Sequence, residues 1–335
     1  MTMEAYFKGK KVLVTGAGGF IGSHLVEKLV ALGADVQALV HYNALNSWGN
    51  LELIDPQARR EVDVRLGDVS DPFCIDGLVK GKDMVFHLAA LIGIPYSYIA
   101  PQQYVIVNVI GTVNVLEAAR RHGISKMVHT STSETYGTAQ YTPIDEKHPL
   151  QGQSPYSASK ISADLMVESY QRSFRVPVAI CRPFNTFGPR QSSRAVIPTM
   201  IIQLLNGKKD VKLGSLEPYR DFNYVSDTVR GLLAVGASEK SIGEVINVGS
   251  GRSVRVKEVW EILQRLTGIS AEVSREESRV RPVLSEVMKL EADATKAREL
   301  VGWSSEVTLE EGLAWAVEWY GRNLQRYNKA DMYVV

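Results

Sequence analysis

The chain has 335 residues, which at about 150 residues per domain allows one large domain or two unequal ones. Apolar residues make up 45% and charged residues 22%, the balance of a globular protein, and no apolar run has the length that a bilayer span needs. The net charge of +1 excludes a broad electrostatic field for holding nucleic acid or an anionic membrane, so we expect neither as a partner.

The amino-terminal segment runs into a strand pattern without an apolar signal core, so we expect a cytoplasmic protein. Cys74 and Cys181 lie far apart and fit neither a disulfide framework nor a metal site, so we expect two buried thiols. The six histidines show no H-x-x-x-H spacing, and we expect no metal.

The first half of the chain alternates short β-branched runs with helical patterns. Strands are expected at 11–15, 35–40, 83–88, 126–130, 177–181 and, later, 244–248. Helices are expected at 21–32, 111–121 and 155–174. This alternation predicts an α/β fold with a Rossmann-like, doubly wound parallel sheet.

After Arg182 the pattern changes, because prolines and glycines break up a stretch with no clear period. Helical patterns return at 256–266, 293–300 and 309–320, and residues 323–335 are weakly patterned and expected to fray. We therefore expect an NAD(P)-binding domain at 1–183 and 222–250. A smaller, mainly helical substrate domain would take 184–221 and 251–330.

A glycine-rich loop, T-G-A-G-G-F-I-G at 15–22, follows the first strand and opens the first helix. Gly16 would allow the tight turn, Gly19 the approach of a pyrophosphate, and Gly22 the close packing of the helix on the sheet. The spacing is G-x-x-G-x-x-G, and its place between strand and helix predicts dinucleotide binding. A glycine-rich turn without a ligand is the alternative.

The second strand ends at L-V-H-Y-N (39–43), with neither the carboxylate of a typical NAD site nor an arginine for a 2′-phosphate. We favour NAD over NADP because the arginine is absent. Asp68 could approach the adenine, or it could only cap a turn. Trp48 could cover the cofactor or pack on the surface.

The segment S-P-Y-S-A-S-K at 154–160 carries Y-x-x-x-K. Ser154 can cap a helix and Pro155 suits its first position, so Tyr156 and Lys160 would share one helix face. A nearby ammonium would lower the pKa of the phenol, which could then take a proton from a substrate hydroxyl while hydride leaves the same carbon. Thr132 and Glu134, in a hydroxyl-rich loop, could assist as hydrogen-bond partner and further base.

Several blocks together resemble the extended short-chain dehydrogenase/reductase family of NAD-dependent epimerases and dehydratases. They are T-G-A-G-G-F-I-G, H-L-A-A (87–90), S-T-S-E-T-Y-G (131–137), Y-S-A-S-K (156–160), R-P-F-N (182–185) and R-D-F-N-Y-V (220–225). The resemblance implies an NAD(P)-binding domain, a nucleotide-sugar substrate and a homodimer built through a helix bundle.

The resemblance also implies residue roles. The expected catalytic residues are Thr132, Ser133, Glu134, Tyr156 and Lys160. Cofactor contacts are expected from Gly16, Gly19, Phe20, Ile21, Gly22, His41, Asn43, Asp68, Val69, Leu88, Ala89, Ala90, Asn108, Tyr156 and Lys160. Substrate contacts are expected from Asn185, Arg194, Val196, Arg220 and Arg281.

Within that family the chain looks most like nucleotide-sugar 4,6-dehydratases, in particular those acting on activated N-acetylglucosamine in legionaminic acid pathways. The stretches at 42–50, 149–160 and 182–198 carry this likeness. It implies oxidation at C4, loss of water across C5 and C6 with Glu134 as base, and return of hydride to C6. UDP- or GDP-N-acetylglucosamine would be the substrate.

One departure leaves alternatives open. Many 4,6-dehydratases carry Thr-Asp-Glu, whereas this chain has Ser133 in the middle, as do GDP-mannose dehydratases and UDP-glucuronate decarboxylases. A 4-epimerase or such a decarboxylase therefore remains an alternative. Glu134 could also be a loop-stabilising carboxylate, and Arg220–Asp221 only a surface ion pair.

Overall fold

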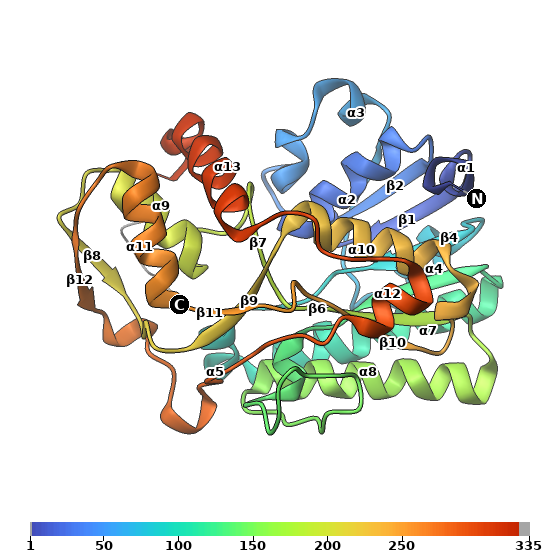
Figure 1. Ribbon diagram of the computed structural model, residues 1–335. Coiled ribbons are helices and arrows are strands. Elements are labelled where there is room, and N and C mark those ends of the chain that lie inside the picture. Colours follow the sequence, from blue (N-terminus) through green and yellow to red (C-terminus); the bar gives the residue numbers. More distant parts are fainter. Residues whose placement is uncertain (1, 328–335) are drawn as a thin grey trace.

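The computed structural model describes residues 2–327. Seven parallel strands of this part form one sheet in the order β10-β6-β5-β4-β1-β2-β3 (Figure 1). Their bounds are β1 Lys11–Thr15, β2 Asp35–His41, β3 Asp63–Gly67, β4 Met84–His87, β5 Lys126–Thr130, β6 Val178–Pro183 and β10 Val245–Val248. The predicted α/β fold with a parallel sheet is confirmed, and the predicted strands match within two residues.

Both faces of the sheet are buried, which explains why its strands are almost continuously apolar. Val12 and Val14 pack with α2 (Phe20–Ala31) and α10 (Val225–Ala237) on one face. Leu13 packs on the opposite face. That face is covered by α4 (Pro72–Val79), α7 (Gly111–His122) and α8 (Pro155–Phe174). Figure 1 shows α8 running along the lower side of the sheet.

Shorter helical segments connect these layers. They are α1 Met3–Phe7, α3 Pro56–Arg60, α5 Ile94–Ile99, α6 Pro101–Tyr104, a π-helical stretch at Val105–Ile110, and 3₁₀ turns at Gly49–Leu53, Ser133–Tyr136 and Glu239–Ser241. Helix α8 starts as predicted. The Ser154 hydroxyl accepts from the Ser157 amide, the Ser157 hydroxyl accepts from the Ser154 amide, and Pro155 takes the first position.

A second group of elements lies beyond the carboxyl edge of the sheet, at the left of Figure 1. It contains a three-stranded sheet, β11-β9-β7, and a two-stranded one, β12-β8. The bounds are β7 Asn185–Phe187, β8 Asp210–Leu213, β9 Tyr219–Tyr224, β11 Ser253–Arg255, β12 Glu272–Arg275, α9 Val196–Leu205, α11 Val256–Thr267 and α13 Leu309–Arg322. Two 3₁₀ turns, Glu277–Arg279 and Val283–Ser285, belong to the same part of the chain. Helix α12, Thr295–Val301, packs instead beside β10 and α10 of the seven-stranded sheet.

Besides several short helices, two helices of ten residues or more were missed by the sequence patterns. Helix α9 contains Pro198 in its first turn, where proline is tolerated, although the residue looked like a helix breaker. Helix α10 follows β9 directly and has Tyr224 at its N-cap without a side-chain capping bond, so no cap signal marked its start.

The carboxyl-terminal expectation is partly wrong. Leu324–Tyr327 forms a 3₁₀ turn, and the Tyr327 ring packs 5.3 Å from that of Tyr320 because both are large apolar surfaces. The remainder of the expected frayed segment, 328–335, lies outside the described residues. Cys181 is buried as predicted, whereas Cys74 is partly exposed at the start of α4. Within 2–327, no helix has the length and apolar character to cross a membrane.

Candidate active site

The predicted site residues gather at the carboxyl edge of the parallel sheet. The glycine-rich loop follows β1, Leu88 follows β4, and the Thr132–Glu134 segment comes just after β5. In open α/β sheets this edge is where ligands bind, because the strand ends and helix starts converge there.

The glycine-rich loop leaves no room for side chains. Gly16 has φ +69°, and a Cβ there would lie 2.7 Å from the Ala89 amide nitrogen. A Cβ on Gly22 would collide with the Gly16 carbonyl oxygen, so Gly22 lets the first turn of α2 pack on the loop itself rather than on the sheet. Gly19 is the N-cap of α2 and makes no side-chain capping bond. The first turn, with Phe20 and Ile21, thus presents backbone amides suited to a pyrophosphate.

The end of β4 is tied to this loop through Thr15, whose hydroxyl accepts from the Leu88 and Ala89 amides. Ala90 continues the same segment. Asn108, in the π-helical stretch, is fully engaged: it bonds both backbone groups of Leu91 and the Ser159 hydroxyl. Its contacts hold the segment after β4 against α8.

His41 and Asp68 meet at the ends of β2 and β3, with 3.7 Å between His41 Nδ1 and Asp68 Oδ2. Asp68 Oδ1 accepts hydrogen bonds from the amide and the hydroxyl of Ser70 and so caps this turn, as the alternative interpretation expected. Asp68 Oδ2 is the oxygen that faces His41. Asn43 points into its own loop and bonds Ser47. Val69 is buried against Gly111.

The Trp48 segment packs on the glycine-rich loop. The Asn50 amide donates to the Gly18 carbonyl, and a Cβ on Gly18 would lie 2.9 Å from the Trp48 carbonyl oxygen. Trp48 also packs against the main apolar core, which favours the packing interpretation of this residue.

Tyr156, in the first turn of α8, is buried beside Thr132, with which its hydroxyl shares a hydrogen bond. Its ring packs edge-on against Tyr104, with 6.3 Å between centroids. The sequence analysis expected the Lys160 ammonium to lower the pKa of the Tyr156 phenol, and the protein alone does not show this. Burial raises the pKa of Tyr156 well above its usual value, and the bond with Thr132 only partly offsets this.

Lys160 lies one helical turn further along, and its ammonium donates to the Thr130 carbonyl at 2.8 Å. Burial lowers the pKa of Lys160 to about 8, although the nearby Asp164 carboxylate opposes this. The lysine is therefore a cation held by the end of β5, on the same helix face as Tyr156.

Beneath Lys160 lies a group that the sequence analysis missed, here called the buried cluster: His129, Ser131, Asp164 and Arg182. Asp164 Oδ2 accepts from Arg182 Nη2 at 2.7 Å and from the Ser131 hydroxyl at 2.6 Å. His129 Nε2 lies 3.3 Å from Asp164 Oδ1. Although burial alone would raise it, Arg182 and His129 hold the pKa of Asp164 well below its usual value. The spacing Tyr156, Lys160, Asp164 was the available signal, because residues four apart share a helix face.

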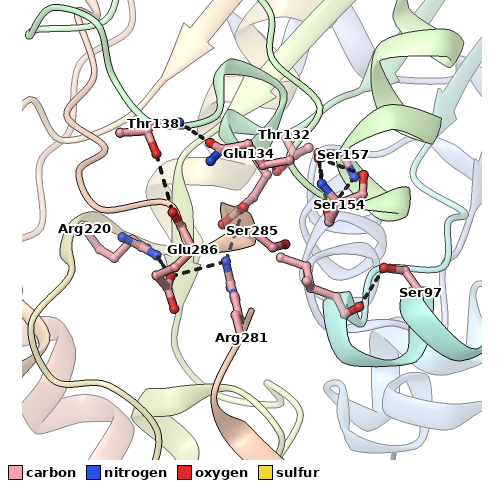
Figure 2. Close-up of polar contacts among 12 residues, drawn as sticks. Ser97, Thr132, Glu134, Thr138, Ser154, Ser157, Arg220, Arg281, Ser285 and Glu286 are labelled. Atoms are coloured by element: carbon pink, nitrogen blue, oxygen red, sulfur yellow. Dashed lines mark hydrogen bonds and ion pairs between the residues drawn. The ribbon is translucent and has the colours of Figure 1, made fainter. Parts of the chain in front are cut away.

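The Thr132–Ser133–Glu134 triplet forms the start of a buried 3₁₀ turn, capped by the Thr132 hydroxyl. In the described part of the chain, the partner of the Glu134 carboxylate is the Arg281 guanidinium, 3.4 Å away (Figure 2). This partner is a side chain and not the loop backbone, so the contact does not favour a loop-stabilising role.

All five predicted substrate residues line one open cleft: Asn185, Arg194, Val196, Arg220 and Arg281. Apart from Pro95 of α5, the residues that line the cleft lie between positions 185 and 286. Arg279 and Glu286 also line it, and the sequence patterns did not single them out. Arg281 joins the cleft to the Thr132–Glu134 segment through its contact with Glu134.

The interpretation of Arg220–Asp221 as a surface ion pair is wrong, because both side chains are buried and face different partners. Arg220 bonds Glu286. Asp221 accepts from the backbone amides of Ser250, Gly251 and Ala292 and so fixes these loops.

Comparisons with known proteins identify the family of this chain. The model of the GDP-mannose 4,6 dehydratase family matches residues 13–315. A dTDP-glucose 4,6-dehydratase of Actinoplanes is 35% identical over 93% of this chain and 98% of its own. A UDP-glucose 4-epimerase of Mycolicibacterium smegmatis is 32% identical over 94% and 100%. The structure of a Streptomyces venezuelae dTDP-glucose 4,6-dehydratase, solved with NAD bound, covers 96% of this chain and 99% of its own, at 29% identity and a TM-score of 0.85.

The chain therefore belongs to the GDP-mannose 4,6-dehydratase family of NAD-dependent epimerases and dehydratases. The resemblance of the sequence to this family is confirmed. The closeness to legionaminic acid enzymes stays a prediction.

Proposed function

We propose that this protein is an NAD-dependent nucleotide-sugar 4,6-dehydratase. The observation that carries the proposal is the buried Glu134 carboxylate, which acts electrostatically on Tyr156 and contacts the cleft-lining Arg281. An epimerase needs to oxidise and reduce only C4, whereas elimination across C5 and C6 needs a further base at this place.

The residues at the sheet edge fit NAD. The glycine-rich loop and the first turn of α2 would hold the pyrophosphate, and His41 and Asp68 would border the adenosine. The absence of an arginine at 39–43 favours NAD over NADP, and relatives were solved with NAD. When bound, NAD accepts and returns the hydride and adds positive charge near the phenol.

Tyr156 would take the proton of the C4 hydroxyl, with Thr132 sharing its hydrogen bond and Lys160 supplying a positive charge one turn away. Burial raises the pKa of the Tyr156 phenol, so forming the base would require positive charge beyond that of the protein alone. Free protein thus keeps the tyrosine protonated.

The resulting C4 ketone would acidify the proton on C5, which Glu134 removes while water leaves C6. Ser133 is a very weak acid, so Glu134 itself would pass its proton to the leaving hydroxyl. Glu134 is then unprotonated again, and the hydride returned to C6 would be matched by a proton from solvent added at C5, which completes the 4-keto-6-deoxy sugar.

The cleft would hold the nucleoside diphosphate. Asn185 Oδ1 is buried with no hydrogen-bond partner among residues 2–327, and Arg194, Arg220 and Arg281 supply positive charge. The sequence likeness favours UDP- or GDP-N-acetylglucosamine as substrate, and the relatives add dTDP-glucose as a candidate.

A second candidate is a UDP-sugar 4-epimerase or a UDP-glucuronate-type decarboxylase. Ser133 favours it, because the acidic residue of many dehydratases is missing at this position. A relative named as an epimerase covers nearly the whole chain.

The proposal includes a homodimer and the division into a cofactor domain (1–183 and 222–250) and a substrate domain (184–221 and 251–330). Val105, Ile110 and Leu165 are exposed on the π-helical stretch and α8, which pack on one another and would form a helix-bundle interface. A monomeric mass by light scattering would contradict the dimer.

The function is tested by incubation with UDP- and GDP-N-acetylglucosamine, dTDP-glucose and UDP-glucuronate, followed by mass spectrometry. A 4-keto-6-deoxy product, lighter by one water, supports the proposal. A product of unchanged mass would favour the epimerase, and loss of carbon dioxide from UDP-glucuronate would favour the decarboxylase.

A further inference from the structure

Four charged side chains form a group at the junction of the catalytic loop and the cleft, here called the cleft cluster: Glu134, Arg220, Arg281 and Glu286 (Figure 2). Glu286 Oε1 lies 3.0 Å from Arg220 Nη2 and 3.7 Å from Arg281 Nη1. Arg281 Nη1 also lies 3.4 Å from Glu134 Oε2. One Glu286 oxygen is thus shared by two guanidinium groups, and Arg281 is shared by two carboxylates.

The cleft cluster contains two arginines and two glutamates, and their side chains are largely shielded from solvent. Side-chain exposure runs from 7% for Arg220 to 23% for Arg281. Charges at such burial need partners, because an uncompensated ion in a low-dielectric site is costly. Burial tends to lower the pKa of Arg281, but Glu134 and Glu286 together raise it above its usual value.

The contacts are long for charge-assisted hydrogen bonds, which usually lie near 2.7–2.9 Å. Two of the three exceed this range clearly, and each involves a single guanidinium nitrogen. Such contacts can be exchanged for better ones at little cost. A diphosphate diester offers two negative charges and several oxygens, the geometry that guanidinium groups match best.

Both arginines line the cleft, so the two glutamates hold the groups that a diphosphate would use. We propose that the substrate's diphosphate takes Arg220 and Arg281 away from Glu286 and Glu134, so that Glu134 is unpaired only while substrate is bound. This inference rests on the proposed function. Glu134 then becomes available as a base at the moment when its substrate is in place.

Glu286 has no role as a proton carrier in this scheme. It neutralises the arginines in the empty site and competes with the diphosphate for them. Competition predicts that Glu286 weakens nucleotide binding, whereas a residue that merely orients the two arginines would strengthen it. The sign of its effect therefore separates the two roles.

The test is calorimetric binding of UDP, GDP and dTDP, each beside its nucleoside, to the wild type and to Glu286→Gln. The variant should bind the preferred diphosphate about tenfold more tightly, because one charged competitor is withdrawn. Its affinity for the matching nucleoside should not change. The matched control is Glu310→Gln, on α13, which removes the charge of an exposed partner of Arg265 on α11. It should bind the diphosphate and the nucleoside like the wild type.

An unchanged or weakened diphosphate affinity in Glu286→Gln would overturn the inference, and so would an equal gain for the nucleoside. If that variant does not fold, Glu134→Gln provides the same test, since it withdraws the other competitor from Arg281. A wild type that binds none of the three diphosphates overturns the proposed function and the inference with it. Binding by the wild type with loss in the variants overturns the inference alone.

Discussion

Two arginine–carboxylate clusters lie near Tyr156, the proposed base, and they differ in burial and in contact length. In the buried cluster, Arg182 and Asp164 are at most 2% exposed and meet at 2.7 Å. In the cleft cluster, Arg281 and Glu134 are 23% and 10% exposed and meet at 3.4 Å. A short ion pair that is fully buried cannot separate without leaving an unpaired buried charge. A longer, partly hydrated pair can exchange its carboxylate for another anion. The first arrangement suits fixed positioning, and the second suits a ligand-dependent site.

The largest effect on stability is expected from Asp164→Asn. The change leaves the buried Arg182 without its counter-charge, so the free energy of unfolding should fall by about 4 kcal/mol in chemical denaturation. The double variant Asp164→Leu/Arg182→Met should recover much of this loss, because neither charge is then left alone. A loss below about 1 kcal/mol for Asp164→Asn would show that the buried cluster is not a fixed ion pair.

Tyr156→Phe tests the residue that lies between the clusters. The phenol has no ion-pair partner in the described chain, so the variant should fold and bind NAD normally while turnover falls about 1000-fold. Turnover and NAD binding are measured on the same preparation. Near-normal turnover would remove Tyr156 from its role as base.

Arg281→Met tests the cleft cluster. Its guanidinium is proposed to bind diphosphate, so kcat/KM should fall about 50-fold, as expected for the loss of charge-assisted bonds. The free energy of unfolding should fall by less than for Asp164→Asn, because the pair with Glu134 is long and partly hydrated. If Arg281→Met lost as much stability as Asp164→Asn, the ion pairs of the cleft cluster would be as fixed as those of the buried cluster, which would contradict the comparison.

Lys160→Met should change stability less than Asp164→Asn does, and in the opposite direction. Burial lowers the pKa of Lys160 from 10.5 to about 8. The buried ammonium therefore lowers the free energy of unfolding by its full amount below pH 8, and this loss disappears as the pH rises to 10.5. The variant should be more stable than the wild type by about 2 kcal/mol at pH 7, after allowance for the Thr130 carbonyl that loses its partner. The gain should vanish near pH 10 in melting experiments, and a gain that grows with pH would contradict the assignment.

The sequence predicted the elements that carry a local signal. The cap at Ser154 and Pro155 placed Tyr156 in the first turn of its helix, and the glycine spacing placed the α2 start. The conserved geometry of parallel strands then brought these segments to one edge.

The missing parts depend on long-range packing. Glu286 contacts Arg220 of β9, and the two residues lie 66 positions apart in sequence. No local pattern around Glu286 could have indicated this contact. The raised pKa of Tyr156 likewise follows from burial by Tyr104 and neighbouring elements, which no local motif reveals. Asp164 is the exception, since its spacing from Lys160 was readable.

The central claim is that Glu134 removes the C5 proton and so makes this enzyme a dehydratase. The direct measurement is deuterium incorporation at C5 of the sugar during turnover in D₂O, for the wild type and for Glu134→Gln. We predict that the wild-type product carries solvent deuterium at C5, and that the variant oxidises C4 but neither exchanges C5 nor loses water. Exchange at the wild-type rate in Glu134→Gln would contradict the account.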